Sequence, residues 1–180
     1  MTELRLAVQA LSASAFSPYG EMLGKPLPAA GERPVFSNPA TDFWQEHVFE
    51  TGDGGEPEFL WVNYRPGMAS ARSLETHLLT QQAVVPLTGS IVQIVATSDA
   101  DGQPDLSSLA AFQVRQGEGV CMRPGCWHTT RVPGDQQVTC LMLTRRSTTL
   151  DLIGGLNEGS PLQESALAEI PPVVIDLPVV

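Results

Sequence analysis

Residues able to bind a metal or move a proton lie in two short segments, Glu75-Thr76-His77 and Cys126-Trp127-His128. Residues i and i+2 of a β-strand point to the same side, so a strand through the first segment presents a carboxylate and an imidazole together. The turn signal Pro124-Gly125 precedes the second segment. Oxygen and imidazole ligands suit Ni, Mn, Zn or Fe, so the carboxylate and imidazoles of these two segments could together hold a divalent metal ion.

The same carboxylate and imidazoles are candidates for acid–base catalysis, because such groups exchange protons near neutral pH. Glu75, His77 and His128 are therefore the predicted catalytic residues. A hydrogen-bonded structural histidine on a barrel wall is the alternative for His77. His47, in the polar segment Gln45-Glu46-His47, is predicted to lie on the surface.

Short strands must position these residues, because most of the chain is rich in β-branched and aromatic residues separated by Gly and Pro. A turn or brief helix is expected over 12–20, a short turn after the N-cap Asp105, and a helix over 161–169. Regularly spaced short strands indicate a closed all-β barrel or sandwich. The predicted strands cover residues 4–11, 44–50, 59–64, 83–87, 90–96, 111–114, 120–123, 127–132, 138–144 and 173–177.

Length and composition favour one domain over residues 1–180, since 180 residues with 42% hydrophobic content enclose one sizeable core. The net charge of −10 argues against a nucleic-acid partner. No apolar run approaches the roughly 20 residues that cross a bilayer, so no membrane association is expected. The three cysteines lack C-x-x-C spacing, which favours reduced thiols and a cytoplasmic location.

Charge is unevenly distributed along the chain. Residues 59–98 and 115–146 carry seven Arg and three acidic residues, and both candidate site segments lie within them. Because Arg binds carboxylates bidentately, we expect an Arg-lined pocket for a small anion inside an acidic shell. Arginines on the surface are the alternative.

Several segments resemble the ureidoglycolate lyase family of the cupin superfamily. Ala15-Phe16-Ser17-Pro18-Tyr19-Gly20-Glu21 resembles the family's A-F-x-P-Y-G-D/E, and residues 104–112 resemble its P-D-L-x-x-L-R-A-F. Leu74 to Gly89 is similar to its L-E-R-H-P-L-G-S-Q-A-F-x-P-L-x-G segment, and Gly125 to His128 to its G-x-W-H-H. The resemblance runs in one order from about residue 15 to residue 145.

This resemblance implies a cupin-type double-stranded β-helix, a jelly-roll barrel with a few short helices, that forms a homodimer. It implies cleavage of ureidoglycolate to glyoxylate and urea in allantoin and purine catabolism. Arg65 would hold the substrate carboxylate because the family often has an Arg there, with Arg123 and Asn63 as further substrate contacts.

Departures from the family pattern leave other functions open. Cys121-Met122-Arg123 stand where the family has N-Y-H, and Thr129 replaces a second histidine after His128. The resemblance to the cupin metal motifs implies a divalent metal site (Ni, Mn, Zn or Fe) of Glu75, His77, Gln82 and His128, in which Glu75 replaces a His and Gln82 replaces a Glu. The alternatives are a non-catalytic cupin that binds a small carboxylate, and a metal-dependent cupin isomerase or dioxygenase. A catalytic cysteine is a further alternative.

Overall fold

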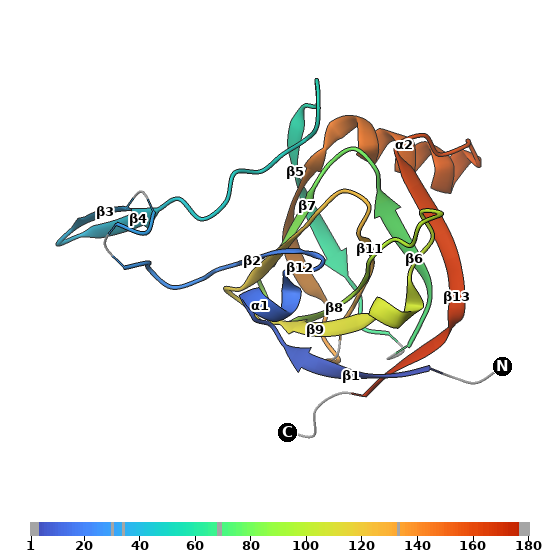
Figure 1. The fold of residues 1–180 in the computed structure, drawn as a ribbon, viewed down its shortest axis with the longest axis horizontal. Coiled ribbons are helices and arrows are strands. Elements are labelled where there is room, and N and C mark those ends of the chain that lie inside the picture. Colours follow the sequence, from blue (N-terminus) through green and yellow to red (C-terminus); the bar gives the residue numbers. More distant parts are fainter. Residues whose placement is uncertain (1–3, 30, 34, 68–69, 133, 177–180) are drawn as a thin grey trace.

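The computed structural model describes residues 4–29, 31–33, 35–67, 70–132 and 134–176. Most of these residues are in strands (Figure 1). The helical elements are α1 (Ala13–Phe16), η1 (Leu106–Ser108) and α2 (Arg146–Glu158). The strands are β1 (Leu4–Ala10), β2 (Gly20–Leu23), β3 (Val35–Asn38), β4 (Thr41–Trp44), β5 (Pro57–Tyr64), β6 (Ser70–His77), β7 (Gln82–Pro86), β8 (Ile91–Ala96), β9 (Ala110–Val114), β10 (Gly119–Met122), β11 (Trp127–Arg131), β12 (Val138–Arg145) and β13 (Ser165–Asp176).

Strands β5 to β12 form two antiparallel sheets with the connectivity of a jelly roll. One sheet has the order β6-β11-β8-β9 and the other has β10-β7-β12-β5, so successive strands mostly cross from one sheet to the other. β2 extends the second sheet, while β13 and β1 close the first into a barrel through parallel β1 pairs with β13 and β9. The predicted all-β, cupin-type double-stranded β-helix is confirmed.

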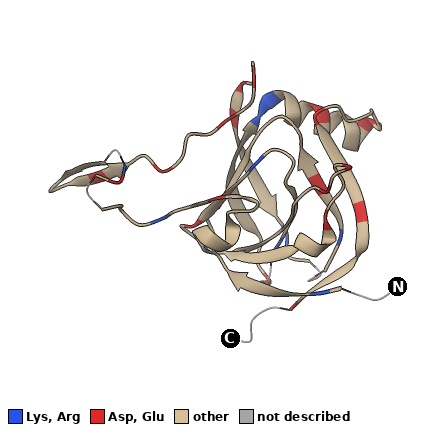
Figure 2. Cartoon of the chain, viewed as in Figure 1, with Lys and Arg blue, Asp and Glu red and all other residues tan. Residues whose placement is uncertain are grey.

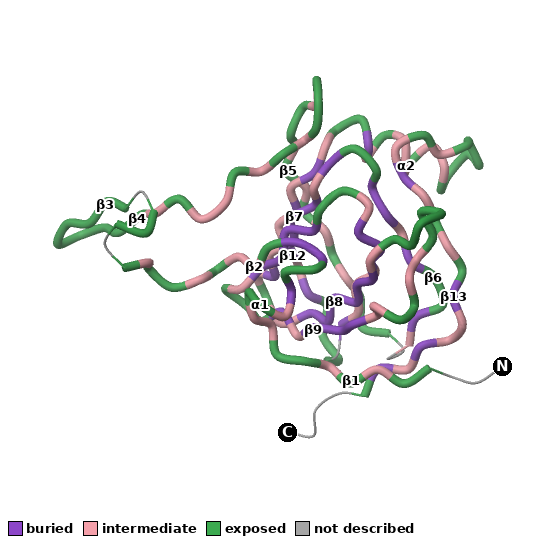
Figure 3. The backbone as a smooth tube through the Cα atoms, viewed as in Figure 1, coloured by how far each residue is buried: buried purple, intermediate pink, exposed green. Residues whose placement is uncertain are grey.

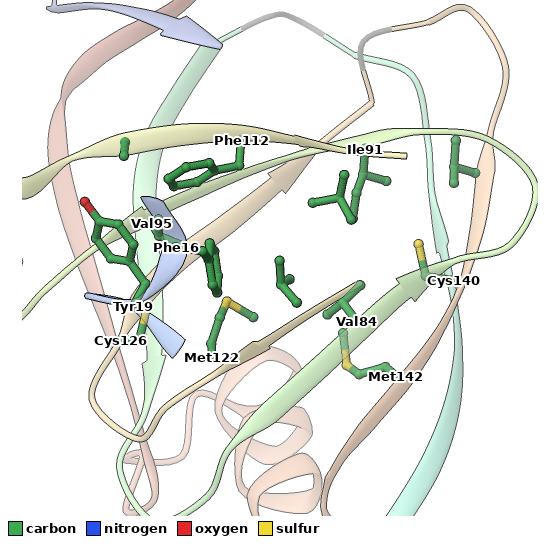
Figure 4. Close-up of a cluster of buried hydrophobic side chains, with 14 of the residues drawn as sticks. Phe16, Tyr19, Val84, Ile91, Val95, Phe112, Met122, Cys126, Cys140 and Met142 are labelled. Atoms are coloured by element: carbon green, nitrogen blue, oxygen red, sulfur yellow. The ribbon is translucent and has the colours of Figure 1, made fainter. Parts of the chain in front are cut away.

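Apolar side chains from both sheets form the main core, part of which Figure 4 shows. Phe16 and Phe112 meet edge to face with ring centroids 5.4 Å apart, and Tyr19 packs beside them. A second buried cluster around Trp127 joins residues of β6, β8, β11 and β13. Burial is concentrated in the central strands β7 to β11 (Figure 3), which hold the site segments in fixed positions.

Most predicted strands are confirmed, as is the turn after Asp105, whose carboxylate accepts a hydrogen bond from the Ser107 amide. The strand predicted over 173–177 is the end of β13, apart from Leu177, which lies outside the described residues. The strand predicted over 44–50 is wrong, because β4 ends at Trp44. The helix predicted over 161–169 is also wrong: β13 begins at Ser165 and pairs with β6. The true helix, α2, precedes it.

The hairpin β3–β4 projects away from the barrel on a long connection (Figure 1). The rings of Phe36 and Phe43 stack on it with centroids 4.9 Å apart, yet both are exposed. Acidic residues are spread over this arm, α2 and β13 (Figure 2). No helix among the described residues is long and apolar enough to cross a membrane.

Candidate active site and metal centre

Neighbouring strands β6 and β11 bring Glu75, His77 and His128 together. His128 stands opposite Glu75 in the strand register, and its Nε2 lies 3.5 Å from Glu75 Oε1. The two imidazole rings have centroids 5.2 Å apart. One potential ligand atom from each of the three residues lies within 4.8 Å of the others, so this group could hold a metal ion.

A tight turn fixes the position of His128. Cys126 N–H donates to Arg123 O across Pro124-Gly125, and Gly125 has a φ of +79° that suits glycine, as a type II turn requires. Gly125 N–H also donates to the carbonyl of His77 at 2.8 Å, which ties this turn to the end of β6. The Pro-Gly signal therefore serves to place one histidine beside the other.

The hydrogen bonds of His128 fix its tautomer. Its Nδ1 lies 2.9 Å from the carbonyl oxygen of Cys126, which can only accept, so Nδ1 carries the proton. In the neutral ring Nε2 then bears a lone pair. This Nε2 is buried and has no hydrogen-bond partner among the described residues, although Glu75 lies beside it. A buried lone pair facing a carboxylate is an arrangement that a cation would complete.

His77 is buried and held at both ring nitrogens. Its Nδ1 lies 3.1 Å from Ser165 Oγ on β13, and its Nε2 lies 2.7 Å from the amide Nε2 of Gln82, which donates to it. Burial, together with the positive charge of His128, lowers the pKa of His77 from 6.5 to about 4. At neutral pH His77 is thus an uncharged imidazole, the form that binds metals.

Glu75 is the most accessible member of the group, with its side chain 34% exposed. Burial raises the pKa of its carboxyl, but the neighbouring imidazoles of His128 and His77 outweigh burial, so the pKa is lowered. The residue is ionised at neutral pH. The cluster therefore combines one carboxylate with two imidazoles, a donor set that suits a divalent transition metal.

A cavity of about 280 Å³ adjoins the cluster and is lined by Glu75, His77 and Gln82. Its other walls are apolar side chains of β5 and α2, together with Tyr64, Met142 and threonines of β12 and α2. Helix α2 covers one side and is tied down by Thr148, whose hydroxyl donates to Glu164 at 2.6 Å. The described lining contains no Arg or Lys, so this cavity is not the expected Arg-lined pocket.

Tyr64 is a cavity residue that sequence reasoning missed. On β5, Leu60, Val62 and Tyr64 face the cavity, as alternation along a strand requires. Burial raises the pKa of Tyr64 to about 12, so its hydroxyl stays protonated at neutral pH. The alternation was the available signal, but Phe59 and Trp61 on the opposite face are apolar too.

The predicted substrate contacts are not brought to this cavity. Asn63 and Arg65 alternate with Tyr64 along the chain, so their side chains point to the other face, and both are exposed. Asn63 Oδ1 accepts a hydrogen bond from the Thr139 hydroxyl. Arg123 is also exposed and donates to the carbonyl of Ser17 at 2.7 Å. Their contact with a substrate stays a prediction that the geometry of the cavity does not support.

The remaining sequence candidates lie away from the cluster. His47 is half-buried rather than fully exposed, and its Nε2 lies 2.9 Å from Gln81 Oε1. The three cysteines are buried and free of disulfides. Burial raises the pKa of Cys121 and Cys126 to about 12 and that of Cys140 to about 11, which leaves no thiolate nucleophile at neutral pH.

Comparison with known proteins gives one consistent family. The family model described as ureidoglycolate lyase matches residues 3–158. A ureidoglycolate lyase of Chelativorans sp. (strain BNC1) is 26% identical over 97% of this chain and 98% of its own. Another, from Rhodobacter capsulatus, is 33% identical over 72% of this chain and 79% of its own.

A solved structure of a dTDP sugar isomerase from Desulfovibrio desulfuricans G20 is a more distant match. It is 13% identical, covers 76% of this chain and 80% of its own, and has a TM-score of 0.43. The sequence matches span the whole site, from β5 to α2. The chain belongs to the ureidoglycolate lyase family.

Proposed function

We propose that this protein cleaves ureidoglycolate to glyoxylate and urea. The observation that carries the proposal is the Glu75–His77–His128 cluster beside a cavity covered on one side by α2, in a chain of the ureidoglycolate lyase family. Ureidoglycolate bears a carboxylate, a hydroxyl and a ureido nitrogen on one carbon. Its cleavage removes the hydroxyl proton, forms the aldehyde C=O, and breaks the C–N bond with its electron pair going to the urea nitrogen, which takes up a proton.

Glu75 is the best placed base for the hydroxyl proton. It is ionised, lines the cavity and is the only cluster member with substantial exposure among the described residues. Tyr64 lines the same cavity and carries a proton at neutral pH, so its hydroxyl can donate to the departing urea nitrogen. His128, held by the carbonyl of Cys126, keeps its Nε2 lone pair beside the base.

The charge of the cavity supports a metal at the cluster. An anionic substrate enters a site that already holds the Glu75 carboxylate and has no described basic lining residue except the histidines. A divalent ion bound by Glu75, His77 and His128, with Gln82 as a fourth candidate ligand, would supply the missing positive charge and lower the pKa of the substrate hydroxyl. Ni, Mn, Zn and Fe all suit these ligands.

Release of glyoxylate and urea from ureidoglycolate by the purified protein, assayed with each metal restored, tests the proposal. Substituting His128→Ala should lower turnover by about 10²-fold or more. His47→Ala is the matched control, since His47 lies outside the cluster and should leave turnover unchanged. Substrate binding without product would instead identify a non-catalytic binding protein, and oxygen consumption would identify an oxygenase; either result refutes the lyase.

We infer further that the protein acts as a homodimer in the cytoplasm, within allantoin breakdown. Free, buried cysteines are consistent with a reducing compartment. Support for association comes from aromatic residues that the single chain leaves uncovered: Phe43 on the arm is 61% exposed and Trp61 on β5 is 70% exposed. Exposed apolar patches of this kind mark protein interfaces. Light scattering of the purified protein measures the oligomeric state directly.

A further inference from the structure

A second cavity, of about 430 Å³, gathers three arginines from different parts of the fold. Arg65 follows β5, Arg72 lies on β6 and Arg131 ends β11. Hydroxyl side chains complete the polar lining, from Ser70, Ser73 and Thr130. The cavity lies toward the beginning of β6, whereas His77 lies at the end of that strand.

The positive charge of this cavity is not neutralised by the chain. Its described lining contains no acidic residue, although the sequence has 20 Asp and Glu against 10 Lys and Arg. Within the described part of the chain, Arg5, Lys25, Arg145 and Arg146 make ion pairs with carboxylates, whereas none of the three cavity arginines does. Like charges gathered in one hollow repel one another, and a bound anion removes that repulsion.

Arg131 is fixed in place before any ligand arrives. Its Nε donates to the Ser70 carbonyl at 2.7 Å, and its Nη1 donates to Thr129 Oγ1 and to the Thr130 carbonyl at 2.9 and 2.8 Å. Its Nη2 makes no hydrogen bond with any described residue, and neither do the hydroxyls of Ser70 and Ser73. A half-buried guanidinium with a free amino group beside free hydroxyls is organised to bind an oxyanion.

This cavity is separate from the metal cluster, and the two cavities share no lining residue. A small intermediate cavity of about 270 Å³ shares Ser73, Thr130 and Arg131 with it, and shares Tyr64 and Glu75 with the cavity at the cluster. Arg131 comes three residues after His128 on β11. At about 3.3 Å per strand residue, the backbone of Arg131 lies roughly 10 Å along β11 from that of His128.

We propose that Arg65, Arg72 and Arg131 form a second binding site, specific for a small oxyanion that carries a carboxylate or a phosphate group. Arg131 and the serine hydroxyls bind the oxygens at the base of the cavity, while the two exposed arginines close over the anion. The planar guanidinium group can pair with the oxygens of either a carboxylate or a phosphate. The described lining contains no acidic residue that would repel these oxygens.

Isothermal titration calorimetry with inorganic phosphate and with malonate, in about 0.15 M salt, tests this site and separates the two chemistries. We expect saturable binding of at least one probe, weakened about tenfold or more in the Arg65→Ala/Arg72→Ala double variant. Both side chains are exposed, so this variant should fold. Arg131→Lys retains the charge but loses the guanidinium fork, and should also weaken binding.

Two controls locate the anion. Arg115→Ala removes one exposed arginine that makes no ion pair and lies outside the cavity, and should bind like the wild type. His128→Ala should also retain binding, because the site does not depend on the cluster. The proposal is overturned if neither probe binds, if the double variant binds normally, if Arg115→Ala loses as much affinity, or if His128→Ala abolishes binding.

Discussion

Because His77 is buried as a neutral imidazole, the free energy of unfolding should depend on pH between about pH 4 and pH 6.5. The pKa of His77 is about 4 in the folded protein and 6.5 when exposed. Between these values the unfolded chain takes up a proton that the folded chain refuses, so stability is fully present above pH 6.5 and falls as the solution is acidified. From about pH 7.5 to about pH 5 this difference amounts to about 2 kcal/mol of unfolding free energy.

The assay is urea denaturation at those two pH values, followed by tryptophan fluorescence, in the presence of a chelator that keeps metal from the cluster. His77→Gln removes the titrating ring and should remove about 2 kcal/mol from the wild-type difference between the two pH values, whatever its effect on stability at one pH. Glu75 also has a lowered pKa, but it titrates below this window.

His47→Gln is the matched control, because it makes the same replacement at a histidine outside the cluster and leaves His77 in place. This variant should keep the full wild-type difference in the free energy of unfolding between the two pH values. If His77→Gln and the wild type lose the same stability on acidification, His77 is not a buried neutral imidazole in the folded protein.

Three further predictions concern the cavity, the ligand set and the arm. Tyr64→Phe should lower kcat by about 10²-fold with a small change in KM, measured by steady-state glyoxylate release, because it removes a proton donor and little contact area. Gln82→Glu adds a carboxylate next to His77 and should tighten Mn²⁺ binding about tenfold in calorimetry, whereas weaker binding would exclude this side chain from the ligand set. Phe36→Ser/Phe43→Ser should shift the protein from dimer to monomer in light scattering with an unchanged circular dichroism spectrum; a dimer that persists shows that the arm is not the interface.

The sequence was enough to predict the barrel and the pairing of the two site segments. Short strands separated by Gly and Pro predict a closed all-β barrel or sandwich, and the family resemblance narrows this prediction to the jelly roll. The Glu-x-His spacing and the Pro-Gly turn before His128 are local patterns whose structural meaning does not depend on distant residues.

What the sequence could not decide is which face of β5 turns inward. Phe59 and Trp61 are as apolar as Leu60 and Val62, so alternation alone does not separate the faces. The expected contacts Asn63 and Arg65, taken from the family resemblance, lie on the face opposite to Tyr64. Because side chains alternate between the two faces of a strand, assigning one residue to the wrong face assigns every side chain of that strand to the wrong face.

The helix predicted over 161–169 is wrong for a related reason, since strand formation there depends on a distant partner. Ser165 to Glu169 pair with His77 to Ser73, and those contacts override the local preference for a helix. The arginine site likewise depends on three strands meeting at one place, which no local pattern of residues 65, 72 and 131 reveals.

The parallel pairing of β1 with β13 has a consequence for how the protein is made. Leu4 to Ala7 are matched with Val173 to Asp176, so β1 acquires this neighbour only after β13, far later in the chain, has left the ribosome. Synthesis at roughly 5–20 residues per second leaves β1 with an open edge for many seconds. Such a high sequence separation predicts slow closure of the barrel, with the edge of β1 exposed to chaperones until β13 has emerged.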